Sequence, residues 1–179
     1  PNASLEDRAS DTAAPTGYTS GGSVPSGATL GYVDSDLPGS TKAVRRTGTS
    51  TAANQYLEIR TVDRTVKATA GQTYVASAFM RGSGGTPYII MWFLDAAGGT
   101  LGGAQPDSFV MGEGWKRFVS TPRPAPAGTA FVRVYFRCTS TAAGQDMAIE
   151  IDNVMLQQGE VATNWVPSGS ETATRTAAN

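Results

Sequence analysis

The sequence contains no histidine and only one cysteine, Cys138, among its 179 residues. Without histidine, neither a Ser-His-Asp nor a Cys-His catalytic arrangement can be built, and histidine-based zinc sites are excluded. A single cysteine cannot form an internal disulfide, and it cannot replace histidine as a zinc-ligand set. Cys138 stands at an apolar position of a strand-like run, so we expect a buried, small hydrophobic side chain.

An excess of charge and long apolar stretches are also absent. The formal net charge is −1 at pH 7, so no basic excess is available for phosphate contacts, which argues against nucleic acid as a partner. No stretch approaches the roughly 18 apolar residues of a membrane span, and we expect no membrane insertion. The polar opening Pro1-Asn2-Ala3-Ser4 does not resemble a signal peptide. A protein that acts outside the cell would then have lost its signal by processing or left by another route, such as release of a phage particle.

A sustained helical period is missing as well, whereas turn-forming residues are abundant. The chain has 21 glycines and 10 prolines, and short apolar runs alternate with Gly/Pro/Asp/Ser clusters from about Thr29 onward. This pattern predicts strands near residues 28–33, 42–47, 54–62, 73–81, 87–95, 107–111, 115–123, 130–138 and 147–157. Many short strands at such spacing predict an all-β sandwich, and no internal repeat is evident.

The regions that flank these strands differ in composition. Residues 1–27 are loop-like and rich in small polar residues, and we expect them to pack on the sandwich as an N-terminal segment or long loop. Residues 28–167 form the predicted sandwich domain. The polar residues 168–179 are predicted to be a tail or linker.

Alternation within the predicted strands separates a core face from an outer face. Burying several arginines is costly, so the arginine-free face must be the core. The core sets are Val132, Val134, Phe136 and Cys138 in one strand and Tyr74, Ala76, Ala78 and Met80 in another, with Leu57, Ile59 and Thr61 opposing Tyr56, Glu58 and Arg60 in a third. The run 88–94 is apolar on both faces, which predicts a central strand covered on both sides, with Trp92 in the core.

Four motifs, in order along the chain, carry a resemblance to a known group. They are Asn2-Ala3-Ser4-Leu5-Glu6, the strand segment 66–81 with Gly71 and Tyr74, Trp115-Lys116-Arg117-Phe118, and the closing strand 149–156 with Asp152. Together they resemble family 4, 9 and 22 carbohydrate-binding modules over most of residues 1–157, with Leu5 where the family usually has phenylalanine. The resemblance implies a two-sheet antiparallel jelly-roll β-sandwich, in which one sheet often forms a glycan-binding face.

The segment from Leu156 to Pro167, with Gly159, Ala162 and Trp165 at spaced positions, adds a second resemblance. It is similar to the ending of such modules in phage tail and other virion proteins. There the sandwich is a structural or adhesion domain, and Trp165 is expected to dock the following tail onto it.

An outer face of aromatic and arginine side chains is the main binding candidate. Aromatic rings cover the apolar C–H faces of sugars, while arginine and glutamate hydrogen-bond their hydroxyls. The candidate residues are Tyr56, Glu58, Arg60, Phe79, Arg81, Arg133, Tyr135 and Arg137, provided that their strands share a sheet. The same residue types are enriched at protein interfaces, so a subunit-facing surface stays an alternative.

The resemblance also implies a structural calcium that ties the N-terminal segment to the last strand. Glu6 and Asp152 stand at the family's calcium-associated positions, and Asn2 is close by in sequence. Carboxylate and amide oxygens are the ligands that calcium prefers. The alternative is that these side chains cap turns or bond to backbone. No other cofactor is expected.

Two functions without catalysis remain open at this point, and a catalytic domain is a third idea. Glu58, Glu113 and Glu150 offer carboxylates for glycoside hydrolysis, but no spacing singles out a facing pair. The first hypothesis is a phage virion protein of the tail, a fibre or the capsid decoration, which assembles with other virion proteins or with copies of itself and attaches to host-surface polysaccharide. The second is an accessory glycan-binding module of a secreted bacterial polysaccharide-degrading enzyme.

Overall fold

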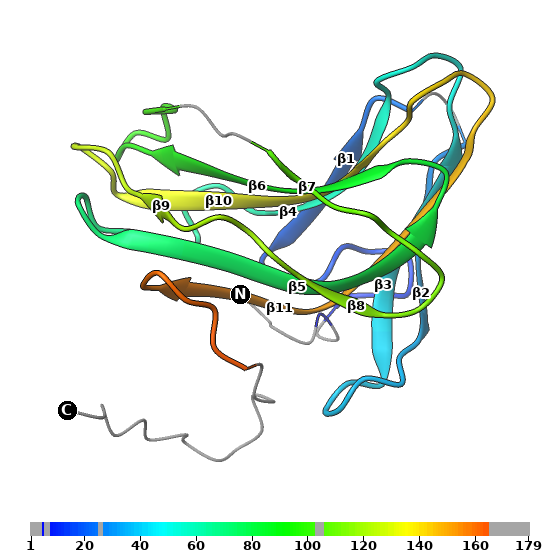
Figure 1. The fold of residues 1–179 in the computed structure, drawn as a ribbon, viewed down its shortest axis with the longest axis horizontal. Coiled ribbons are helices and arrows are strands. Elements are labelled where there is room, and N and C mark those ends of the chain that lie inside the picture. Colours follow the sequence, from blue (N-terminus) through cyan, green and yellow to red (C-terminus); the bar gives the residue numbers. More distant parts are fainter. Residues whose placement is uncertain (1–4, 6–7, 25–26, 103–105, 165–179) are drawn as a thin grey trace.

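The computed structural model describes residue 5 and residues 8–24, 27–102 and 106–164 (Figure 1). These residues form eleven strands: β1 (Tyr18–Gly22), β2 (Thr29–Asp34), β3 (Lys42–Thr49), β4 (Tyr56–Thr61), β5 (Thr73–Ser83), β6 (Thr86–Leu94), β7 (Asp107–Ser108), β8 (Lys116–Val119), β9 (Arg123–Pro124), β10 (Phe131–Thr139) and β11 (Asp146–Gln158). No helix in the described part of the chain is long and apolar enough to cross a membrane.

The strands form two antiparallel sheets that lie face to face. One has the order β1-β4-β10-β6-β7, and the other has the order β2-β3-β11-β5-β8, with β9 also pairing with β5. Figure 1 shows the two layers, with β5 and β11 below β6 and β10. The all-β jelly-roll sandwich predicted from the sequence is confirmed.

The core lies between the sheets and follows the predicted alternation. Val132, Val134, Phe136 and Cys138 are all at most 1% exposed, because alternate side chains of an antiparallel strand point to the same side. They pack in one cluster with the inward residues of the other sheet, such as Met80 and Ile151. Burial raises the pKa of the Cys138 thiol to about 12, so this cysteine is a neutral hydrophobe, as expected.

The N-terminal part is more ordered than a loop. Residues 18–22 form β1, an edge strand that pairs with β4, although the prediction placed them in the loop-like region 1–27. The sequence Thr19–Gly22 has little strand propensity, and its pairing with β4 and the burial of Tyr18 outweigh that preference. Before β1 in the chain, Leu5 is also fully buried in the core.

Strand β6 also differs from the prediction. It is one strand from the edge of its sheet, and only its inner face, with Ile89 and Met91, is covered by the other sheet. Trp92 is directly opposite Arg133 of β10 and is half-buried on the outer face. Its assignment to the core is therefore wrong, because an apolar run does not reveal which of its faces is covered.

Two loops that cross between the sheets have nearly the same sequence, contrary to the expectation of no internal repeat. Residues 50–55 read Ser-Thr-Ala-Ala-Asn-Gln and connect β3 to β4, while residues 140–145 read Ser-Thr-Ala-Ala-Gly-Gln and connect β10 to β11. The two connections run in opposite directions between the sheets, at the same end of the sandwich (Figure 1). A six-residue similarity is too short to stand out before the structure shows the two loops side by side.

The two loops hold each other through mirrored hydrogen bonds, and we call them the twin-loop clasp. The Ser50 hydroxyl donates to the Ala142 carbonyl at 2.8 Å, and the Ser140 hydroxyl donates to the Ala52 carbonyl at 2.9 Å. Backbone bonds follow the same symmetry, from Ser50 N to the Gln145 carbonyl and from Ser140 N to the Gln55 carbonyl, at 3.0 and 2.7 Å. The clasp thus ties both crossings together at one end of the sandwich.

Each loop of the clasp is also closed by its own glutamine. The side-chain oxygen of Gln55 accepts from the amides of Thr51 and Ala52, and that of Gln145 accepts from the amides of Thr141 and Ala142. The residue before each glutamine is left-handed, with φ of 64° at Asn54 and 74° at Gly144. Asparagine and glycine are the residues that tolerate this conformation best.

Candidate functional site

Six of the eight predicted binding residues come together on the outer face of the five-stranded sheet. Tyr56, Glu58 and Arg60 alternate along β4, and Arg133, Tyr135 and Arg137 alternate along β10. The register pairs Arg60 with Tyr135 and Glu58 with Arg137, so their side chains lie directly beside one another.

The neighbouring strand and a loop complete this surface. Trp92 of β6 packs on Tyr135 with ring centroids 5.5 Å apart, and it also faces the guanidinium of Arg133 at 5.1 Å. Asp63, just after β4, accepts a hydrogen bond from Arg133 at 2.7 Å. We call this surface the arginine–tyrosine face; its members are Tyr56, Glu58, Arg60, Asp63, Tyr88, Trp92, Arg133, Tyr135 and Arg137.

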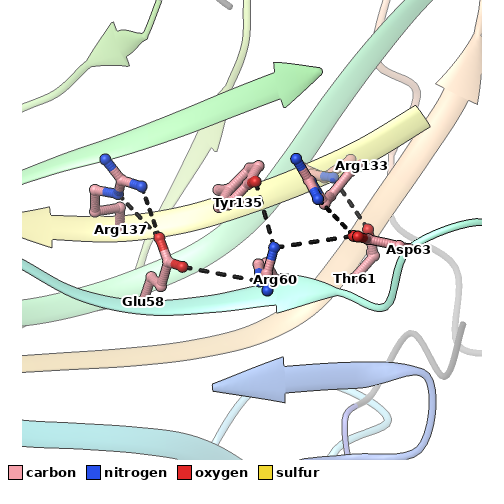
Figure 2. Close-up of polar contacts among 8 residues, drawn as sticks. Glu58, Arg60, Thr61, Asp63, Arg133, Tyr135 and Arg137 are labelled. Atoms are coloured by element: carbon pink, nitrogen blue, oxygen red, sulfur yellow. Dashed lines mark hydrogen bonds and ion pairs between the residues drawn. The ribbon is translucent and has the colours of Figure 1, made fainter. Parts of the chain in front are cut away.

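Ion pairs form a continuous row across the face (Figure 2). Arg137 donates to one oxygen of Glu58 through Nε and Nη2, at 3.1 and 2.7 Å. The other Glu58 oxygen is 3.9 Å from Nε of Arg60, and Arg60 in turn is 3.5 Å from the Tyr135 hydroxyl and 3.9 Å from Asp63. Each charged side chain is therefore held in place by at least one neighbour.

Aromatic rings orient the same arginines. The guanidinium of Arg137 lies 3.8 Å from the ring centroid of Tyr56, and Arg133 and Arg60 approach the Tyr135 ring at 5.2 and 5.6 Å. Burial raises the pKa of Tyr135, and the nearby arginines offset this only in part. Its hydroxyl is therefore neutral at ordinary pH and can both donate and accept hydrogen bonds.

A small hollow opens on this face beside Arg137. Its volume is about 160 Å³, and it is lined by Tyr88, Ile90, Pro106, Arg137 and Thr139. Typical sites for drug-sized ligands are larger, at roughly 300–1,000 Å³. The hollow can therefore hold one chemical group of a larger ligand that extends over the face.

Phe79 and Arg81 do not belong to this surface, which corrects the prediction that grouped them with it. Strand β5 lies in the other sheet, so both side chains face outward on the opposite side of the sandwich. There Arg81 donates to Glu150 at 2.5 Å and stacks on Trp115 at 4.5 Å. The condition that all candidate strands share a sheet is met by β4 and β10 only.

The same geometry separates two of the carboxylates considered for glycoside hydrolysis. Glu58 is on the outer face of the five-stranded sheet and is paired with Arg137. Glu150 is on the outer face of the six-stranded sheet and is paired with Arg81. These two side chains cannot face each other across one cleft.

Similarity to known proteins appears in structure and not in sequence. No protein-family model matches the sequence, and no curated protein matches it. The C-terminal family 22 carbohydrate-binding module of Clostridium thermocellum Xyn10B superposes with a TM-score of 0.55 at 16% identity, over 91% of this chain and 95% of that module. The chain has the fold of a carbohydrate-binding module.

Modules of this fold also match as parts of larger proteins. The enzymatically active domain of bacteriophage CBA120 tailspike protein 4 matches with a TM-score of 0.61 at 16% identity, over 80% of this chain and 19% of that one. The α-L-arabinofuranosidase MgGH51, bound to arabinose, matches with a TM-score of 0.62 at 17% identity, over 88% of this chain and 26% of that one. The chain therefore spans about a fifth to a quarter of these two structures.

Of the three residues expected to bind calcium, only Asp152 is among the described residues. Asn2 and Glu6 lie outside the described residues. Asp152 is fully buried, and its two oxygens accept from the Ser35 hydroxyl at 2.5 Å and from the Asn153 amide at 2.7 Å. The side-chain oxygen of Asn153 is buried without a hydrogen-bond partner, which is the type of donor that calcium prefers.

The described residues alone do not complete such a site. Within residues 8–24, 27–102 and 106–164, no group of three or more cysteine, aspartate or glutamate side chains could hold a metal ion. Asp152 and Asn153 fit a calcium ion as partial ligands, and further oxygens would have to come from elsewhere, such as the N-terminal residues.

Proposed function

We propose that this protein is a non-enzymatic structural or adhesion protein of a phage particle, from the tail, a fibre or the capsid decoration, and that it binds host-surface glycans through the arginine–tyrosine face. The observation that carries the proposal is the gathering of Tyr56, Trp92 and Tyr135 with three arginines on one outer sheet face. Rings of this kind cover the C–H faces of sugars, and the arginines and Glu58 hydrogen-bond hydroxyls.

The virion assignment is supported by two similarities. The segment 156–167 is similar to the ending of such modules in virion proteins, and the fold matches part of a phage tailspike protein. Virion proteins are repeated in many copies on one particle, so weak single sites would add up to firm attachment. The proposed location is therefore the virion, and the proposed partners are other virion proteins or copies of this chain.

The alternative is an accessory module of a secreted bacterial polysaccharide-degrading enzyme. It is favoured by the match to part of an arabinofuranosidase. Mass spectrometry of purified particles separates the two roles: the protein is expected among the particle proteins, and its presence only in culture medium, linked to a hydrolase, would support the alternative.

Glycan-array binding tests the face itself. We expect the protein to bind a subset of bacterial surface polysaccharides, and Arg133→Ala and Tyr135→Ala to lose that signal. Arg45→Ala is the matched control, because Arg45 is an exposed arginine on the opposite sheet, paired with Glu150. Thermal melting of each variant checks folding. Full binding by folded Arg133→Ala and Tyr135→Ala proteins would reject this face as the site.

We also propose that a structural calcium bound through Asp152 joins the N-terminal segment to β11. The buried Asp152 carboxylate and the unpartnered Asn153 oxygen support it.

A further inference from the structure

The charges of the arginine–tyrosine face do not balance. Three arginines, Arg60, Arg133 and Arg137, share two carboxylates, Glu58 and Asp63. One positive charge is therefore left over in a row of side chains whose members are otherwise paired.

Exposure makes the part of the face around Arg137 and Arg60 more positive than this count. The Arg60 and Arg137 side chains are 32% and 24% exposed, whereas that of Glu58 is only 8% exposed. Asp63 is 47% exposed, but it lies at the end of the row. A ligand that settles on the centre of the face meets guanidinium groups and little carboxylate.

Arg137 still has a donor that a ligand can reach. Nε of Arg133 also has no hydrogen-bond partner, but it is buried in a side chain that is only 10% exposed. Arg137 uses Nε and Nη2 for Glu58, and in Figure 2 its remaining nitrogen points away from that carboxylate. The same residue lines the hollow of about 160 Å³, whose other lining residues carry no charge.

The flanking strands do not supply the missing negative charge. On the outer face β1 contributes Thr19 and Gly21 next to β4, and β6 contributes Tyr88, Ile90 and Trp92 next to β10. None of these residues is acidic. The opposite outer face is different, because there Arg45 and Arg81 share one hollow with Glu113 and Glu150, two of each sign.

We propose that the natural ligand of the arginine–tyrosine face is an acidic polysaccharide, with a uronic-acid carboxylate bound by Arg137 at the hollow. Guanidinium groups match carboxylates in shape and form charge-assisted hydrogen bonds with them. The inference rests on the proposed glycan binding and adds the class of glycan. Tyr56 and Trp92 cover sugar rings, while the surplus positive charge selects polymers that carry carboxylates.

The test compares each acidic polymer with its own neutral derivative. The probes are polygalacturonate, alginate and hyaluronan, each before and after chemical reduction of its carboxylates to alcohols, with affinity measured by calorimetry or biolayer interferometry. At least one acidic polymer is expected to bind, and its reduced form is expected to bind roughly tenfold more weakly, since one charge-assisted hydrogen bond is lost. Added salt should weaken the acidic form only.

Three variants provide the matched controls. Arg137→Gln removes a positive charge from the face and should weaken binding of the acidic form. Asp63→Asn keeps an oxygen that can accept from Arg133 and removes a negative charge, so it should tighten that binding. Arg45→Gln removes the same charge from the opposite face and should leave it unchanged. Tighter binding by Asp63→Asn cannot result from misfolding, which keeps the test decisive if Arg137→Gln is unstable.

The outcomes distinguish the two proposals. Equal affinity for acidic and reduced polymers overturns the acidic-ligand inference and leaves glycan binding intact. If that equal binding is lost in Tyr135→Ala, the face binds glycans without selecting those that carry carboxylates. Absence of binding to every acidic and reduced probe, together with a blank glycan array, overturns both.

Discussion

Arg137 is held from two sides, and this explains how a charged side chain can be part of a fixed surface. Its guanidinium forms two hydrogen bonds to one oxygen of Glu58 and lies 3.8 Å from the ring centroid of Tyr56. Arginine is suited to such a position because its planar group can stack and bond at the same time. Lysine would retain the charge and lose both features.

Replacing Arg137 should therefore affect stability as well as binding. Arg137→Ala leaves the nearly buried Glu58 without its closest partner, and we expect a loss of about 2 kcal/mol in the free energy of unfolding. Urea unfolding measures it. Glu58→Gln with Arg137→Ala should recover most of the loss, because no nearly buried carboxylate is then left without its closest partner. A loss below about 0.5 kcal/mol, as for an exposed pair, would contradict the description of this pair as partly buried.

Burial of Cys138 makes the stability of the protein depend on pH, and it fixes the direction of that dependence. In the folded protein the thiol pKa is about 12, whereas an unfolded cysteine ionises near pH 8.5. The unfolded state loses its proton first, so stability is full below about pH 8.5 and falls as the pH rises toward 12, by about 1.4 kcal/mol per unit at most.

Unfolding measured between pH 8 and pH 9.5 separates this contribution when the wild type is compared with Cys138→Ala, because the tyrosines, which ionise near pH 10, contribute equally to both proteins. The wild-type protein should lose stability over this range, and Cys138→Ala should show a clearly flatter dependence. At pH 8 the native thiol should also fail to react with a thiol reagent until denaturant is added. Fast reaction of the native protein would show that the thiol is accessible.

At the scale of elements, the twin-loop clasp shows how two crossings between sheets support each other. Gln55 and Gln145 each satisfy two amides of their own loop, and Ser50 and Ser140 each bond to the opposite loop. Backbone groups of loops need such partners when water cannot reach them. Because the two loops repeat one sequence, a substitution in one loop can be judged against the residue at the equivalent position of the other.

The left-handed residue of each loop tests this equivalence. A Cβ added at Gly144 would meet no atom within 4 Å, so any cost of substitution comes from the backbone alone. Gly144→Asn, which copies Asn54 of the other loop, should change the free energy of unfolding by a few tenths of a kcal/mol. Gly144→Val should cost at least about 1–2 kcal/mol, since β-branched residues avoid positive φ. Equal effects of the two substitutions, measured by thermal or urea unfolding, would argue that the loop relaxes out of this conformation.

For the whole molecule, the calcium proposal predicts a dependence of stability on divalent ions. A ligand that binds only the folded state adds about 2.7 kcal/mol at a hundred times its dissociation constant, which corresponds to several degrees in melting temperature. EDTA should lower the melting temperature of the wild-type protein, and calcium but not magnesium should restore it. Asp152→Asn should melt at a lower temperature that EDTA no longer changes. An unchanged melting temperature of the wild type in EDTA would reject the site.

The sequence predicts which side chains of a strand point inward and which point outward. It does not predict which strands belong to the same sheet. Val132, Val134 and Phe136 are in the core because side-chain direction alternates within a strand, which is a local property. The separation of Arg81 from Arg133 depends on which distant strands pair, and no local pattern contains that information. Trp92 and Asp63 were missed for related reasons: one belongs to a strand that is apolar on both faces, and the other follows the end of a strand.

The clasp also has a consequence for the surroundings in which the protein can work. Its serine hydroxyl bonds join positions 92 and 88 residues apart in the sequence, a task that many exported proteins give to a covalent sulfur bridge. Hydrogen bonds form equally well in the presence of reductant or oxidant. A chain built in a reducing cell interior and used outside the cell, as proposed for a virion component, would therefore mature without an oxidation step, and dithiothreitol should leave its melting curve unchanged.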